Sequence, residues 1–106
     1  MRYKDHLAPF TLGLELINRL RPITFTWKQD GMRDLGLGAE EVAEVEPLLV
    51  THNERGQVEG VKYDRIGVAL INAIREQQEM IRRQQVEIDE LKRLACKANP
   101  NARLCK

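Results

Sequence analysis

Aliphatic residues near the start of the chain recur at the spacing of one helical face. Four of them are separated by intervals of one, three or four residues: Leu12, Leu16, Ile17 and Leu20. This spacing is typical of an amphipathic helix. Pro22 follows directly, and a proline cannot continue a helix and restricts the residue before it. We therefore expect a short helix over residues 12–20.

After the proline the period of the pattern changes from a helical one to an alternating one. Ile23, Phe25 and Trp27 alternate with polar residues, so they would share one face of a strand over residues 23–28. The pair Asp30-Gly31 follows and is a turn signal.

The next thirty residues predict short elements separated by turn residues. These elements are a brief strand at Leu35 and Leu37, a short helix over residues 39–45 ended by Pro47, a strand over 48–51, a turn over 53–56 and a return strand over 57–61. Residues 1–62 are therefore expected to form a small α+β layer.

The remainder of the chain predicts one long helix. From Asp64 to about Lys97 there is no proline, and Gly67 is the only glycine. Asp64 is expected to cap the helix start, with its side chain accepting an orphan backbone N–H. At ~1.5 Å per residue, ~34 residues extend ~50 Å, too far for a ~60-residue layer to cover. The predicted fold class is α+β, with the layer followed by a helix over residues 63–98 and a frayed or looped tail over 99–106.

A heptad pattern runs along this helix and predicts a parallel coiled coil. One set of positions holds Gly67, Ile74, Ile81, Ile88 and Ala95, and the set three residues later holds Leu70, Gln77, Gln84 and Leu91. Glu87 and Lys92 flank this seam, where charges pair between neighbouring helices. Val86 falls on the outer face. A helix packed entirely within one domain is the alternative.

Three further apolar residues broaden the apolar face of the first half of the helix. They are Val68, Ile71 and Met80. We expect this half to pack on the α+β layer as well as on sister helices. The seam alone does not decide between a dimer and a trimer.

Composition and charge exclude several classes of function. A length of 106 residues fits one domain, and 42% hydrophobic with 31% charged residues is an ordinary soluble mixture. The net charge of +1 produces no field that favours nucleic acid or an anionic membrane. No segment approaches ~20 continuous apolar residues, and the N-terminus lacks the apolar stretch of a signal peptide.

Residues with catalytic or metal-binding chemistry are sparse. His6 and His52 are isolated, and Cys96 and Cys105 have no neighbouring histidine, so we predict no metal and no cofactor. The cysteines are expected to be free thiols or to close a local loop. The chain contains no serine.

Three segments together resemble a known family. They are LINRLRPITFTWK (16–28), DLGLGAEEVAEVEPLLV (34–50) and VKYDRIGVALINAIREQQEMI (61–81). In order and spacing they are similar to the intramolecular chaperone domain of endosialidase-type phage tail spikes, the peptidase S74 family. The resemblance covers roughly residues 2–92. Gly38 departs from it, because the family usually has a bulkier apolar residue there.

The resemblance implies a homotrimer at the C-terminus of a phage tail spike or tail fibre, where it assists the folding of an upstream β-rich stalk. It also implies self-cleavage by a serine–lysine pair within a Ser-Asp-x-Arg-x-Lys pattern. Arg2 and Lys4 match the last two positions. The serine would fall two residues before Met1 and is missing, so this chain is expected to be inactive, with Met1 an introduced start or a substituted residue.

The resemblance further implies a location in the host cytoplasm during virion assembly, with the domain later released from, or attached to, the virion tail. A purely structural coiled-coil trimerisation module without cleavage is the alternative. A basic-helix nucleic-acid binder is disfavoured by the balanced charge.

Overall fold

A computed structural model describes residues 2–106 and divides the chain into two compact units, Met1–Ile74 and Arg75–Lys106. Met1, which the sequence interpretation treats as an introduced start or a substituted residue, lies outside the described residues. The long helix α3 (Tyr63–Ala98) begins in the first unit and continues through the second. The predicted helix over 63–98 is confirmed.

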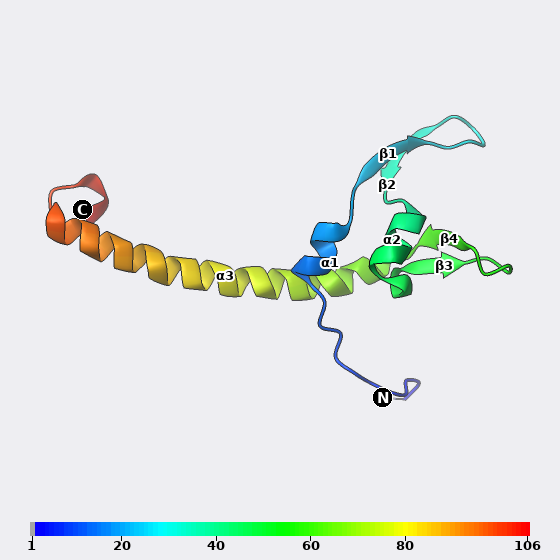
Figure 1. Cartoon of the computed structure of the whole chain (residues 1–106), viewed down its shortest axis with the longest axis horizontal. Coiled ribbons are helices and arrows are strands. Elements are labelled where there is room, and N and C mark those ends of the chain that lie inside the picture. Colours follow the sequence, from blue (N-terminus) through cyan, green and yellow to red (C-terminus); the bar gives the residue numbers. More distant parts are fainter. Residues whose placement is uncertain (1) are drawn as a thin grey trace. The chain divides into compact units, whose positions relative to one another are not determined.

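The first unit is a small α+β layer built from two helices, two hairpins and the first turns of α3 (Figure 1). In chain order its other elements are α1 (Leu14–Arg19), β1 (Ile23–Thr26), β2 (Arg33–Gly36), α2 (Ala39–Val45), a 3-10 turn (Pro47–Leu49), β3 (Val50–His52) and β4 (Val58–Val61). The strands form two separate antiparallel sheets, β1 with β2 and β3 with β4.

Most predicted elements are present, with shifted ends. The helix predicted over residues 39–45 has those bounds, whereas the one predicted over 12–20 is limited to α1. The strand predicted at Leu35 and Leu37 instead spans β2, because the turn after β1 sets its register. The strand predicted from Leu48 begins at Val50, because Glu46 accepts a hydrogen bond from the Leu48 backbone N–H and winds residues 47–49 into a 3-10 turn.

The core of the layer is built from single buried apolar side chains of α1, α2, the 3-10 turn, β3 and α3. Its buried members are Leu16, Val42, Leu49, Val50 and Ala69. Ala69 and Ala73 are the buried residues of α3. Because alanine has only a methyl group, the backbone of α3 can approach the layer closely at these two positions.

The first hairpin presents the apolar face that the alternating pattern predicts. Ile23 and Phe25 are half-buried, and the rings of Phe25 and Trp27 meet edge to face with centroids 4.9 Å apart. Trp27 lies just beyond β1 and is 49% exposed. Its indole N–H donates to Asp34 Oδ2 at 3.1 Å, which ties the two ends of the hairpin loop together.

The start of α3 is held by a tyrosine rather than by the predicted aspartate cap. The helix begins at Tyr63, so Asp64 lies in its first turn and is not the N-cap, and the prediction is wrong. The Tyr63 hydroxyl accepts a hydrogen bond from the Leu37 backbone N–H at 3.0 Å, which joins the loop before α2 to the helix start. A Cβ on Gly36 would lie 2.5 Å from that hydroxyl oxygen, so the contact requires a glycine there.

We therefore predict that Gly36→Ala lowers the free energy of unfolding by about 1 kcal/mol, because the Tyr63 hydroxyl must move and its hydrogen bond with the Leu37 N–H is lost. The same change should cost much less in a Tyr63→Phe background, because the oxygen that meets the new methyl group is gone. Urea denaturation of the four proteins at one protein concentration measures the coupling.

Gly38→Ala is the matched control. A Cβ at Gly38 meets its nearest atom at 3.9 Å, an ordinary contact, and the backbone φ of −76° suits alanine. Equal losses for the two glycine substitutions would contradict the assigned role of Gly36.

Candidate functional site

The predicted coiled-coil seam is a line of exposed apolar side chains on α3. The apolar seam residues with exposed side chains are Leu70 (42%), Ile74 (54%), Ile81 (62%), Ile88 (53%) and Leu91 (65%). Gln77 and Gln84 are exposed between them. Large apolar side chains that recur along one helix face and contact water indicate a surface for a partner. That these side chains pack against sister helices stays a prediction.

The first turns of α3 bury a different face. Ala69 and Ala73 are buried, and Ile66 packs against the core cluster. The predicted packing of this half on the α+β layer is therefore confirmed. Val68, Ile71 and Met80, which were expected to broaden the apolar face, remain about half exposed. Val68 and Ile71 occupy other heptad positions than Ala69 and Ala73, whereas Met80 repeats the position of Ala73 one heptad later, in the second unit.

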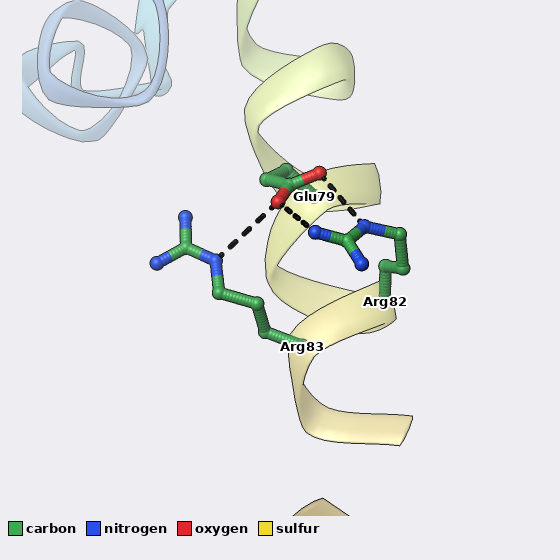
Figure 2. A network of polar contacts seen from close by, with 3 residues as sticks. All are labelled: Glu79, Arg82 and Arg83. Atoms are coloured by element: carbon green, nitrogen blue, oxygen red, sulfur yellow. Dashed lines mark hydrogen bonds and ion pairs between the residues drawn. The ribbon is translucent and has the colours of Figure 1, made fainter. Parts of the chain in front are cut away.

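The outer face of the second unit has a small network of charges (Figure 2). Arg82 donates to both carboxylate oxygens of Glu79, at 2.6 and 3.1 Å, and Arg83 Nε lies 3.7 Å from Glu79 Oε1. The hydrogen bond from Arg82 holds the pKa of the Glu79 carboxyl below its usual value. Glu79 therefore pairs with both arginines at the surface and offsets part of their charge, which argues against a basic helix that binds nucleic acid.

Arg2 and Lys4 lie in an exposed N-terminal segment. Every residue from Arg2 to Pro9 is exposed, and the segment has no regular secondary structure. The Arg2 guanidinium lies over the Tyr3 ring, 5.5 Å from its centroid. Since the expected serine is absent from the sequence, the catalytic roles of Lys4 and Arg2 remain predictions.

Asn72 is a site residue that the sequence interpretation missed. Its side-chain amide donates two hydrogen bonds, to the carbonyl oxygens of Phe10 at 2.8 Å and of Leu12 at 3.0 Å. The available signal was a polar residue between Ile71 and Ala73 on the helix face opposite the seam. That signal does not reveal the partner, which is about sixty residues away in the sequence.

A groove of about 450 Å³ in the first unit combines aromatic and acidic side chains. It is lined by, among others, Phe25, Trp27, Tyr63, Asp34, Glu40 and Glu59. The backbone N–H of Leu35, and then the Trp27 indole, lower the pKa of Asp34 by hydrogen bonding. The lining includes no serine, cysteine, histidine or lysine.

The C-terminal residues form a closed loop. Cys96 and Cys105 are joined by a disulfide, with their Cα atoms 5.7 Å apart. Of the two possibilities left open by the sequence, free thiols and a local loop closure, the structure has the second. The tail is correspondingly looped, with a 3-10 turn at Arg103–Cys105.

Residues 2–106 bear on two further kinds of site, a metal centre and a membrane span. Among them no group of three or more histidine, cysteine, aspartate or glutamate side chains is placed to hold a metal ion. In the same part of the chain no helix is both long enough and apolar enough to cross a membrane.

Comparison with known families agrees with the sequence resemblance. The family model described as chaperone of endosialidase, Peptidase_S74, matches residues 1–51. The match extends from the N-terminal segment through α1, the first hairpin and α2 to the start of β3. No curated protein matches the chain. The resemblance is thus confirmed over these residues, and it supports an intramolecular chaperone role.

The disulfide leads to a prediction about assembly. Because it closes a loop within the last eleven residues of one chain, it cannot link chains, and Cys96→Ala with Cys105→Ala should leave the mass of the assembly unchanged. Light scattering after size exclusion, with and without reductant, measures this. A fall in mass on reduction or substitution would show that assembly depends on the closed loop.

Proposed function

We propose that this chain is a C-terminal intramolecular chaperone that forms a parallel homotrimer through α3 and assists the folding of an upstream β-rich stalk in a phage tail spike or tail fibre. The observation that carries the proposal is the exposed apolar seam on a domain whose first half matches the chaperone of endosialidase family. The corresponding location is the host cytoplasm during virion assembly, with the domain later released from, or attached to, the tail.

A partner is physically needed because the layer is small. Few of its side chains are fully buried, and a single core in a domain of this size provides only marginal stability. Isoleucine and leucine along the seam would gain the missing burial by packing against sister helices. The number of three chains rests on the trimeric parents that the resemblance implies.

Self-cleavage is the finer part of the proposal. In a parent with Ser-Asp directly before Met1, the serine hydroxyl would attack the carbonyl carbon of the preceding residue, and its proton would pass to the neutral Lys4 amine. The peptide C–N bond to the serine nitrogen would then break, the protonated Lys4 would return the proton to that nitrogen, and an ester to the serine oxygen would remain. Water would then hydrolyse the resulting ester and release the domain. Arg2 would help to keep Lys4 neutral, because a nearby cation disfavours the protonated amine. A trimerisation module without cleavage remains the alternative, and a parent that lacks the serine would favour it.

We predict that Ile88→Asp disrupts the trimer and Val86→Asp does not. The two residues are close in sequence and equally exposed in the single chain, at 53% and 50%, but only Ile88 occupies a seam position. A carboxylate in the seam would be buried without a partner, which costs several kcal/mol per chain. On the outer face it would stay in water.

Light scattering after size exclusion tests this directly. The unmodified chain and Val86→Asp should give about three times the 12.2 kDa chain mass, and Ile88→Asp should give a smaller species. A monomeric mass for the unmodified chain at micromolar concentration would contradict the proposal. Equal effects of the two substitutions on the mass would show that the heptad register is wrong.

We further predict that a chain extended upstream through Ser-Asp cleaves itself, and that Lys4→Ala slows this by ~10²–10⁴-fold, the usual contribution of a general base. Lys28→Ala, which removes the same charge from the first hairpin loop, is the control. Gel electrophoresis over time measures the rate. Cleavage of the Lys4→Ala chain at the unmodified rate would exclude the serine–lysine assignment.

A further inference from the structure

The N-terminal segment, which from Arg2 to Gly13 has no helix or strand (Figure 1), divides into an exposed part and a part that packs on the core. Residues 2–9 are exposed, whereas Phe10 and Leu12 are half-buried and pack against the core cluster. Gly13 is buried, and its carbonyl accepts the first hydrogen bond of α1 from the Ile17 N–H. The chain therefore packs on the layer at Phe10, Leu12 and Gly13 and is exposed before them.

Asn72 lies at the boundary between these two parts, and its single side-chain amide donates hydrogen bonds to two backbone carbonyls. Its Nδ2 donates to the carbonyl oxygens of Phe10 and Leu12, at 2.8 and 3.0 Å. An amide nitrogen has two N–H groups, so both are used. A carbonyl that loses its donor where water has poor access is costly, so these bonds favour one path for the segment across α3.

The donor is available only when α3 is helical at this point. Asn72 is separated from its acceptors by 60 and 62 residues, and it lies near Ala69 and Ala73, the buried residues of the same helix face. Unwinding these turns would remove the amide from the two carbonyls. The clamp, meaning the Asn72 amide with the Phe10 and Leu12 carbonyls, therefore reports whether α3 has formed on the layer.

The clamp also limits where Lys4 can lie. Lys4 lies six positions before Phe10, and an extended chain of that length reaches at most ~20 Å. The serine expected two residues before Met1 lies five positions further upstream, within ~40 Å of Phe10. Fixing Phe10 thus limits the distance of both groups from the clamp, and it limits Lys4 the more closely.

We propose that Asn72 is a positioning residue that makes self-cleavage conditional on the folding of α3. This inference rests on the proposed function, because it concerns the same serine–lysine reaction. Asn72 touches neither of the reacting groups. It acts by seating the segment that carries them, and it does so only after the helix that assembles the trimer has formed.

The test compares Asn72→Asp with Asn18→Asp in the chain extended through Ser-Asp. Both substitutions keep the side-chain shape and add one negative charge, but Asn18 lies on the exposed surface of α1. The carboxylate of Asn72→Asp cannot donate to the two carbonyls. We expect the first-order cleavage rate to fall about tenfold or more while the mass of the trimer is retained, since small misplacements of reacting groups slow reactions by this much.

Asn72→Gln separates positioning from stability. It keeps the donating amide at the end of a longer side chain, so it should recover much of the cleavage rate even where its melting temperature is no higher than that of Asn72→Asp. All rates are compared at temperatures where each variant is folded and trimeric. Asn72→Ala, which adds no charge, serves where the aspartate variant fails to fold.

A second measurement on the present chain follows the clamp without any cleavage chemistry. Chymotrypsin should cut after Phe10 faster in Asn72→Asp than in the unmodified chain or in Asn18→Asp. If the extended parent cleaves and Asn72→Asp cleaves equally fast, the positioning role alone is overturned. If the unmodified extended parent does not cleave, the proposed reaction fails, and the positioning role fails with it.

Discussion

The packing of the first turns of α3 on the core of the α+β layer is the contact on which the rest of the first unit depends. Ala69 and Ala73 are buried there, and Ala69 belongs to the core cluster. Ile66 also packs against the core cluster, whereas Leu70 and Ile74 remain exposed. One helix therefore contributes Ile66, Ala69 and Ala73 to the layer and leaves larger apolar side chains in contact with water.

This division explains why the sequence predicts the elements better than their contacts. Periodicity depends on local spacing, and it gave α2 with its exact bounds and α3 within one residue or so at each end. It also placed Ile23 and Phe25 on one face of β1. The prediction from capping preference failed at Asp64, because a specific tertiary contact of Tyr63 with the Leu37 backbone holds the start of the helix instead.

The sequence could predict only the part of the candidate site that repeats along the chain, which is the seam. The seam recurs every seven residues and is visible in the sequence, but Asn72 occurs once and its partners are backbone carbonyls, which have no sequence signature. The pairing of Gly36 with Tyr63 was hidden for the same reason, since neither residue indicates the other. The resemblance placed Arg2 and Lys4 in a motif, and only a chain that contains the serine can test their roles.

The geometry also constrains the order in which such a chaperone can act. The face of α3 that holds Asn72 and the face that holds the seam are on opposite sides of the helix, so the clamp and the proposed trimer do not compete for the same surface. Folding of the first turns of α3 on the layer would stabilise the helical seam, and a seam packed against sister helices would in turn keep the clamp closed. Closing of the clamp and assembly of the proposed trimer both require the same helical turns. Each event would therefore raise the population of chains in which the other has occurred. A cleavage site tethered to the clamp would thus be seated most often in the assembled protein, without any dedicated sensor of assembly.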